Sequence, residues 1–411
     1  MRARLIISGS KAMNKNLFLP ANILLPKREP EKWSVIACDQ YTSEPDYWKR
    51  VEEFVGDEPS ALKIVFPEVY LSGDNSKRTA EINANMQEYL DGDVFNTYEN
   101  TFVYVERRLA NGKLRRGIVG LIDLENYSYE SGSHALIRAT EETVAERIPP
   151  RVEIRRGAPM EIPHIMLLID DPERSVIEPL GKALESEETL YDFDLMQNAG
   201  HIKGRRASGK TAEEIQKRLN SLIEKDDDKL LFAVGDGNHS LAAAKECYRL
   251  NKTESTRYAL AEVVNIYDDS LEFEPIYRLL FGVDPEEVIN GFLSSLGGEY
   301  RGEDAQKFTC VYGEKEREIS VKPAAKLAVG TLQTYLDGYL KQNRQASIDY
   351  IHGETSVREL SKAENTLGFI FDGMRKDELF EAVRQNGSLP RKTFSMGCAD
   401  DKRFYLEGRK F

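Results

Sequence analysis

The sequence of 411 residues contains few cysteines and no long apolar run, and each shortage excludes a class of protein. Neither a disulfide framework nor a zinc site is indicated, because no Cys-x-x-Cys pair or nearby histidine pair accompanies the four cysteines. Apolar runs such as IMLLI, residues 165–169, fall far short of the roughly twenty residues that span a bilayer. We therefore expect a cytoplasmic protein with no membrane partner.

Basic residues are also in deficit, with 56 Lys and Arg against 69 Asp and Glu and a formal net charge of −13. A molecule of this charge is repelled by nucleic acid, so no nucleic-acid partner is expected, although a local basic pocket is still allowed. The hydrophobic content of 41% and the charged content of 30% are typical of a globular protein. Composition leaves the oligomeric state open.

The order of expected elements indicates an α+β fold with mixed sheets and helices. The strands TFVYVERRL and RRGIVGLIDLENYSY flank the turn ANGKL, whose Asn-Gly pair favours a hairpin. We expect a flexible leader at 1–13, an N-terminal α+β region at 14–159, a central region at 160–290 and a C-terminal α+β region at 291–411.

Residues 204–211, GRRASGKT, have the spacing of a phosphate-binding P-loop. A P-loop needs a buried strand before its first glycine, but the preceding residues, DLMQNAGHIK, are polar and contain a glycine, so we expect no strand there. Thr211 and Glu214 have the spacing of a capping box ahead of an amphipathic helix. The start of a surface helix, with Lys210 in solvent, therefore explains the motif better.

A strand, a glycine turn and a helix are predicted for KLLFAVGDGNHSLAAAKECYRL, residues 229–250. Leu230–Val234 is an apolar strand, Gly235 and Gly237 permit a sharp turn, and an alanine-rich helix begins near Ser240. Such a turn directs several backbone N–H groups and the helix dipole at one point, which favours a bound phosphate.

Four polar side chains occupy this turn. Asn238 and Ser240 can cap the helix or donate to a phosphate oxygen, and His239 can exchange a proton near neutral pH. Asp236 would be repelled by phosphate unless a cation lies between them or it accepts a proton from a reacting hydroxyl, which implies Mg²⁺ held by Asp236. An ordinary Asp-Gly turn followed by capping residues is the structural alternative.

The stretch IACDQYTSEPDYW, residues 36–48, places further polar residues after an apolar run. Asp39 is a candidate general base or metal ligand. Cys38 is a weaker candidate nucleophile, because no histidine is near it in the sequence and buried cysteines are usually inert. We expect structural roles for the histidines outside the turn, which show no metal-ligand spacing: His134, His164, His201 and His352.

The segment GDGNHS resembles the Asp-Gly-His-His-Arg signature of the DUF1015 family, which is similar to the phosphate-binding turn of the ParB and sulfiredoxin superfamily that includes free serine kinases. The likeness extends over nearly the whole chain through residues 115–151, LEFEPIYRLLF and SLPRKTFSMG, which resemble further family segments in the correct order. IACDQYTSEPDYW is similar to the family's Pro-Tyr-Asp segment. The resemblance implies a fold with a ParB/sulfiredoxin-like strand-turn-helix module that binds phosphate.

This chain departs from the family signature at two positions of the turn. Asn238 stands where the family has its first His, and Ser240 stands where it has Arg, which removes a bidentate phosphate contact. Each basic residue that could replace this contact can equally be a solvated surface charge: Arg138, Arg147, Arg151, Arg278 and Lys392.

The resemblance implies a phosphoryl-transfer enzyme, kinase- or phosphatase-like, that uses ATP or ADP and Mg²⁺ on a small hydroxylated or phosphorylated metabolite such as serine or phosphoserine. Asp236 would act through Mg²⁺, and His239 with Asp39 would handle the hydroxyl proton. The alternative is a non-catalytic sensor that binds a phosphorylated metabolite or nucleotide at the same turn.

Overall fold

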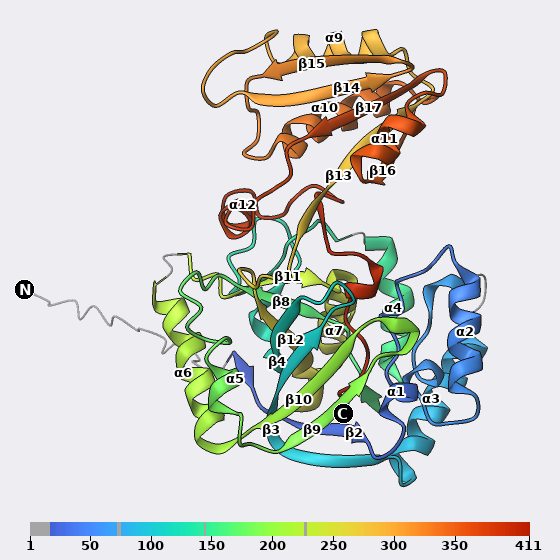
Figure 1. Ribbon diagram of the computed structural model, residues 1–411, viewed down its shortest axis with the longest axis vertical. Helices are drawn as coiled ribbons and strands as arrows, with labels where there is room; N and C mark the ends of the chain where they lie inside the picture. The colour runs from blue at the N-terminus through green and yellow to red at the C-terminus, as the bar shows by residue number, and fades with distance from the viewer. Residues whose placement is uncertain (1–16, 72–74, 144, 226–227) are drawn as a thin grey trace, which may run out of the picture.

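The computed structural model describes residues 17–71, 75–143, 145–225 and 228–411, and the predicted leader at 1–13 lies outside these ranges. Within them, one large mixed sheet and one smaller sheet are each flanked by helices (Figure 1). The fold is therefore α+β, as the sequence predicts. The strands of the large sheet are β1 (Phe18–Leu19), β2 (Ala21–Pro26), β3 (Phe95–Arg108), β4 (Leu114–Asp123), β5 (Tyr127–Ser128), β6 (Ile137–Ala139), β8 (Met166–Ile169), β9 (Thr189–Asp194), β10 (His201–Ala207), β11 (Phe232–Asp236) and β12 (Tyr258–Asn265).

The large sheet is buried on both faces. The strand order is β5-β6-β11-β8-β12-β4-β3-β10-β9, with β1 beside β4 and β2 beside β3. Along β3, Phe102 and Tyr104 pack into one apolar core while Val103 and Val105 pack into another, because successive side chains of a strand point to opposite faces. The predicted regions on either side of residue 160 share this sheet, since β4 pairs with β12.

Helices cover both faces of the large sheet and also pack on both faces of the smaller sheet (Figure 1). The helices are α1 (Pro30–Trp33), α2 (Pro45–Val55), α3 (Ser76–Asp91), α4 (Ile148–Arg156), α5 (Leu180–Ala183), α6 (Gly209–Lys225), α7 (Asn238–Leu250), α8 (Glu254–Arg257), α9 (Pro285–Ser295), α10 (Ala328–Gln342), α11 (Glu354–Leu360) and α12 (Glu378–Asn386). None of them, within the described ranges, is long and apolar enough to cross a membrane.

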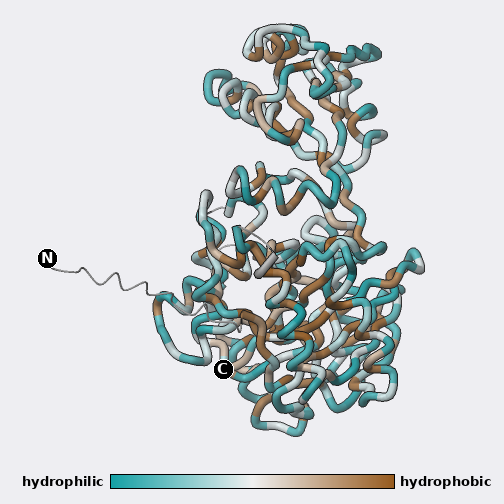
Figure 2. Tube along the Cα trace, turned by 90° about the vertical axis from the view of Figure 1, so that its left-hand side faces the viewer, coloured by the Kyte–Doolittle hydropathy of each residue, from teal (hydrophilic) through white to brown (hydrophobic). Residues whose placement is uncertain are grey.

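The smaller sheet is antiparallel and forms a separate lobe, visible from the side in Figure 2. Strand β13 connects the lobes: its first residues pair with β18 and its later residues pair with β16 and β17. The strands are β13 (Phe273–Phe281), β14 (Gln306–Tyr312), β15 (Lys315–Val321), β16 (Ser347–His352), β17 (Thr366–Phe371) and β18 (Phe394–Met396).

After β18 the chain returns to the large sheet and contacts its N-terminal region. Strand β19 (Arg409–Lys410) pairs with β7 (Met160–Glu161), and the Trp33 indole N–H donates to the Leu406 carbonyl at 3.1 Å. We call residues 398–411 the C-terminal tail. Its position brings residues from the end of the chain next to the turn after β11.

A buried arginine anchors this tail. Nη1 of Arg403 lies 3.1 Å from Oε2 of Glu262 in β12, and Nη2 donates to Glu407. All three side chains are at most 4% exposed. A buried charge is tolerated only when it is paired, so the ion pairs require the tail to lie on β12.

The P-loop motif lies in regular structure. Residues 204–207 belong to β10, which pairs with β3 and β9, so the expectation that no strand precedes the helix is wrong. Pairing on both edges outweighs the low strand propensity of this stretch. Gly204 accommodates Tyr191, since an added Cβ would lie 2.2 Å from the Tyr191 ring.

Only Ser208 separates β10 from α6. A single residue leaves no loop that could surround a phosphate. Helix α6 begins at Gly209, two residues before Thr211, so the predicted capping box at Thr211 is also wrong.

We predict that Arg403→Met lowers the free energy of unfolding by about 3–5 kcal/mol, because two buried carboxylates lose their cation. Urea denaturation followed by circular dichroism measures the change. Lys49→Met is the matched control, since Lys49 pairs with Asp46 on the surface at 3.0 Å and should contribute less than about 1 kcal/mol. Equal effects of the two substitutions would contradict a buried anchor.

Candidate functional site

The predicted turn follows the buried strand β11 and leads directly into α7. Gly237 has φ of 80°, and an added Cβ would lie 3.1 Å from the Ile165 Cα, so glycine is required both for the conformation and for the close approach. The Leu241 N–H donates to the Gly237 carbonyl at 2.9 Å, which starts the hydrogen-bond ladder of the helix. The N–H groups of Asn238, His239 and Ser240 precede this ladder and lie at the positive end of the helix dipole.

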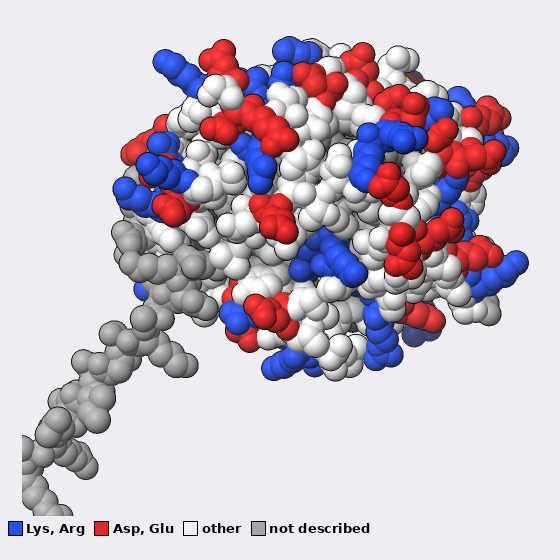
Figure 3. Space-filling model, turned by 90° about the horizontal axis from the view of Figure 1, so that it is seen from below, with Lys and Arg blue, Asp and Glu red and all other residues white. Residues whose placement is uncertain are grey.

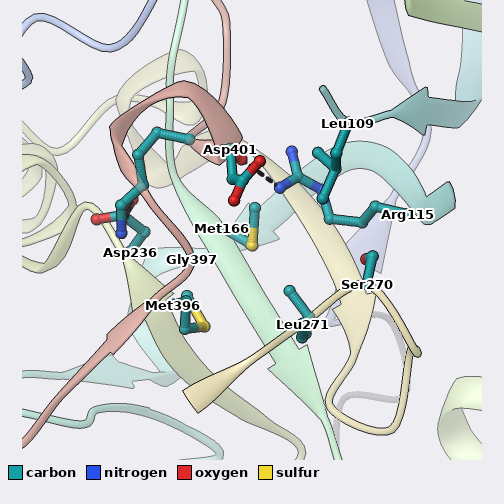
Figure 4. A pocket seen from close by; sticks show the side chains of 10 residues that line it. Leu109, Arg115, Met166, Asp236, Ser270, Leu271, Met396, Gly397 and Asp401 are labelled. Atoms are coloured by element: carbon teal, nitrogen blue, oxygen red, sulfur yellow. Dashed lines mark hydrogen bonds and ion pairs between the residues drawn. The ribbon is translucent and has the colours of Figure 1, made fainter. Parts of the chain in front are cut away.

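Asp236 lies in a narrow space between the large sheet and the C-terminal tail. Its Oδ1 accepts the Gly237 N–H at 3.0 Å, and its Oδ2 lies 3.4 Å from Nζ of Lys402. The side chain is 17% exposed and lines a cavity of about 10 Å³, into which Met166 and Met396 also point (Figure 4). That cavity holds about one water molecule. The sequence implied a cation beside Asp236, and Lys402 supplies one.

His239 lies among several arginines. Burial, followed by the charges of Arg151, Arg147 and Arg391, lowers its pKa to about 4, while Asp39 opposes the shift. The ring is therefore neutral at pH 7, whereas the residue type alone predicted proton exchange near neutrality. The difference arises because desolvation and nearby positive charge both disfavour an imidazolium ion.

Asp39 is also at this site, in the segment after the bridge between Ile36 and Phe404. Its Oδ2 lies 3.9 Å from Nε2 of His164. Burial by itself raises the pKa of Asp39, but the neighbouring His164, a hydrogen bond from Gln40 and the charge of Lys402 lower it overall. Asp39 is thus a carboxylate at neutral pH. Burial raises the pKa of the neighbouring Cys38 thiol to about 12, which disfavours a nucleophilic thiolate.

The remaining residues of the turn are positioned by packing and hydrogen bonds. An added Cβ on Gly235 would lie 2.9 Å from the Met396 Cε, so this glycine allows β18 to approach. The Ser240 Oγ lies 3.4 Å from Nε2 of His164. The Asn238 Oδ1 is buried without a hydrogen-bond partner among the described residues.

Two of the predicted arginines use their donors elsewhere. Arg138 donates to the carboxylate and carbonyl of Asp228 and to the carbonyl of Ala135. Arg278 is fully buried and donates to the carbonyls of Arg391 and Lys392, so it supports the loop that carries these two residues. Both guanidinium groups are thus bound to other parts of the protein.

Arg151 and Lys392 lie close to the turn. Arg151 acts on His239 through its charge and also pairs with Glu68. The backbone N–H of Lys392 donates to Glu141, whose pKa is raised overall, mainly by burial and further by Asp236, although Lys392 and Lys402 oppose the rise. Glu141 and Asp236 are thus neighbouring carboxylates between two lysines.

Several residues of this site were not predicted from the sequence. His164 immediately precedes Ile165 and β8, and because β8 runs antiparallel to β11, its start lies beside the end of β11. Strand order would have revealed this, but it is not visible in the sequence. The tail residues Lys402 and Tyr405 carry no local signal, whereas Arg391 stands next to a predicted residue in SLPRKTFSMG.

A larger groove of about 530 Å³ lies elsewhere, between α2 and α3. Phe66, Tyr70 and Arg78 are among the residues that line it, and none of the predicted site residues does.

Mg²⁺ is the metal that the sequence implies. Among the described residues, no group of three or more His, Cys, Asp or Glu side chains is arranged to hold a metal ion. Mg²⁺ in phosphate sites takes one or two carboxylates, with substrate phosphates and water completing its coordination. The oxygen donors of Asp236 and Glu141 fit that requirement.

Comparison with known proteins identifies the family. Residues 19–345 match the model of the family described as "Protein of unknown function (DUF1015)", and the chain belongs to it. No curated protein matches the chain.

Solved structures share only a distant likeness with the chain. A mutant free serine kinase in complex with ADP has 12% sequence identity and a TM-score of 0.39, covering 72% of this chain and 92% of its own. A conserved hypothetical protein from Pyrococcus furiosus has 13% identity and a TM-score of 0.36, covering 71% of this chain and 94% of its own. At these TM-scores the likeness says nothing about the ligands of this chain, which have to be inferred from the residues of the site.

We predict that inorganic phosphate raises the pKa of His239 from about 4, because a bound anion offsets the field of the arginines. NMR titration of the imidazole with and without phosphate measures the shift. Phosphate affinity should correspondingly rise as the pH falls towards that pKa. His201 is the control: burial opposes protonation there, but Asp194 and Asp192 raise its pKa overall, and its titration should not respond to phosphate.

In the absence of phosphate, the lowered pKa of His239 makes the stability of the protein depend on pH. The neutral His239 ring contributes stability above its ordinary pKa of 6.5, and this contribution is lost as the pH falls from 6.5 towards 4. The wild-type protein should therefore lose more stability over this window than His239→Gln. Identical pH profiles would contradict the assigned surroundings of His239.

Proposed function

We propose that this protein is a kinase- or phosphatase-like phosphotransferase that binds the phosphates of ATP or ADP at the turn between β11 and α7. The observation that carries the proposal is the convergence of basic side chains on the start of α7. Arg147, Arg151 and Arg391 act on His239, while Lys402 lies 3.4 Å from Asp236. Basic side chains and unsatisfied helix N–H groups at one point favour an anion with several oxygens.

The basic residues are local, which supports a phosphate ligand rather than a nucleic acid. The net charge of the chain is −13, and on the face shown in Figure 3 acidic and basic side chains alternate without a continuous basic patch. A small phosphorylated ligand needs only a confined positive field. The proposed setting is the cytoplasm; Cys38, Cys247, Cys310 and Cys398 are all free thiols.

The carboxylates supply the chemical groups for transfer to a hydroxyl. In the proposed direction, the substrate oxygen forms a bond to the terminal phosphorus of ATP, the bond between that phosphorus and the ADP oxygen breaks, and the hydroxyl proton passes to Asp39. Asp39 is suited to this role because its lowered pKa keeps it ionised, although burial opposes that state. Asp236 and Glu141 would hold Mg²⁺, which would neutralise charge on the phosphates.

The proposed acceptor is a small hydroxylated metabolite, with serine and phosphoserine as the first compounds to test. This choice follows the resemblance of the turn to the superfamily that includes free serine kinases. Neutral His239 can donate a hydrogen bond to the substrate or accept one from it, without adding a positive charge.

A non-catalytic sensor is the second candidate. Ser240 stands where the family signature has an arginine, and without that positive charge the transferred phosphoryl group would be stabilised less well. A sensor would be stabilised thermally by ADP or phosphoserine but would show no turnover.

We predict that Asp39→Asn lowers kcat for Mg²⁺-dependent phosphoryl transfer between ATP and serine by about 10²-fold or more, because the proton acceptor is lost. Asp236→Asn should also abolish most turnover. A coupled assay of ADP release measures both. Asp349→Asn, on an exposed strand of the smaller lobe, is the control and should retain full activity. A folded Asp39→Asn variant with wild-type kcat would refute this assignment.

We predict that Arg391→Gln weakens ADP binding about tenfold, because one charged contact to phosphate is lost. Isothermal titration calorimetry measures the affinity. Lys210→Gln tests the P-loop motif in the same assay and should leave the affinity unchanged. If Lys210→Gln weakened ADP binding and Arg391→Gln did not, the nucleotide would bind at the junction of β10 and α6 instead.

A further inference from the structure

His164 lies at the centre of the site, although the proposed chemistry does not require it. The side chain is 6% exposed and contacts three other side chains of the site. Nδ1 lies 2.7 Å from the hydroxyl of Tyr405, while Nε2 lies 3.4 Å from the Ser240 Oγ and 3.9 Å from the Asp39 Oδ2. The rings of His164 and Tyr405 are nearly perpendicular, at 89°, so the hydroxyl meets the edge of the imidazole.

The direction of these hydrogen bonds follows from the donors present. The backbone N–H of Cys38 donates to the Tyr405 oxygen at 3.3 Å. Burial, followed by the neighbouring Cys38 and Asp39, raises the pKa of Tyr405 well above its ordinary value, so the hydroxyl keeps its proton. The Cys38 side chain also hydrogen-bonds to this hydroxyl, but sulfur is a weak acceptor, so the hydroxyl proton goes to the stronger acceptor, Nδ1 of His164, at 2.7 Å. Nδ1 is therefore the acceptor, and the ring proton is on Nε2.

We propose that Tyr405 fixes His164 as the neutral Nε2–H tautomer, and that His164 thereby acts as a positioning residue for Asp39 and Ser240. The Nε2–H is directed towards both groups. It stabilises the Asp39 carboxylate in its ionised form, and it donates to the Ser240 oxygen. The hydroxyl proton of Ser240 is then free to be donated to a phosphate oxygen.

The C-terminal tail thereby gains a role in the reaction. Tyr405 orients His164, and Lys402, three residues earlier, pairs with Asp236. The tail thus contacts Asp236 directly and Asp39 through His164. The consequence for catalysis rests on the proposed function, but the tautomer of His164 does not.

The experiment is NMR of the full-length protein with ¹⁵N-labelled histidine, recorded at about pH 8, above the ordinary histidine pKa. Long-range ¹H–¹⁵N correlations distinguish the two neutral tautomers and the imidazolium ion. His164→Gln identifies the His164 signals among the five histidines. We expect the Nε2–H pattern in the wild-type protein and a mixture of tautomers in Tyr405→Phe.

Tyr191→Phe is the matched control, because Tyr191 is a buried tyrosine that donates to Glu407 of the same tail but does not contact His164. It should leave the His164 tautomer unchanged. An Nδ1–H tautomer or an imidazolium ion at His164 in the wild-type protein overturns the proposal even when Tyr405→Phe fails to fold. An unchanged tautomer in folded Tyr405→Phe also overturns it.

A measurement of phosphoryl transfer, made beside the NMR experiment, distinguishes a failure of the role of His164 from a failure of the proposed function. Tyr405→Phe should lower kcat about tenfold with little change in KM for ATP, as expected for the loss of one hydrogen bond that positions a catalytic group. A protein with the expected tautomer but no phosphoryl transfer contradicts the proposed function alone. A protein that transfers phosphate but shows the wrong tautomer contradicts the role of His164 alone.

Discussion

The arrangement of the site depends on the buried ion pairs of Arg403. This arginine sits between Glu262 of β12 and Glu407, with almost no exposure to water, so the tail cannot move away without leaving charges unpaired. Its neighbours in the sequence are therefore held against the large sheet. Lys402 reaches Asp236, and Tyr405 reaches His164. The ion pairs of Arg403 thus place two side chains from the end of the chain, Lys402 and Tyr405, beside a turn more than 160 residues earlier.

Electrostatic balance around the turn explains why acidic and basic groups share so small a space. Asp39 stays ionised although it is buried, because His164, Gln40 and Lys402 compensate for its desolvation. His239 stays neutral because burial, and after it the arginines around the ring, disfavour a positive charge there. An anion with several oxygens would relieve the repulsion among Arg147, Arg151 and Arg391. Lys402 or Mg²⁺ would lie between this anion and the Asp236 carboxylate and would reduce the repulsion between them.

The sequence predicted local features of this site better than distant ones. The run Leu230–Val234 and the glycines after it predicted β11 and the start of α7, because hydrophobic patterning and backbone freedom are local properties. For His164 the sequence alone predicts a structural role, because its place beside Gly237 depends on the order of strands in the sheet. Arg138 and Arg278 were candidates on charge alone, yet buried hydrogen bonds occupy both. For β10, pairing with two neighbours overrode a sequence that lacks strand character.

The most direct test of the phosphate site is a crystal structure of the full-length protein with ADP and Mg²⁺. Phosphate oxygens should lie within hydrogen-bond distance of the N–H groups of Asn238–Ser240, with Arg391 and Lys402 around them. A nucleotide bound at Gly209, or in the groove between α2 and α3, with the turn after β11 left without phosphate, would contradict the account.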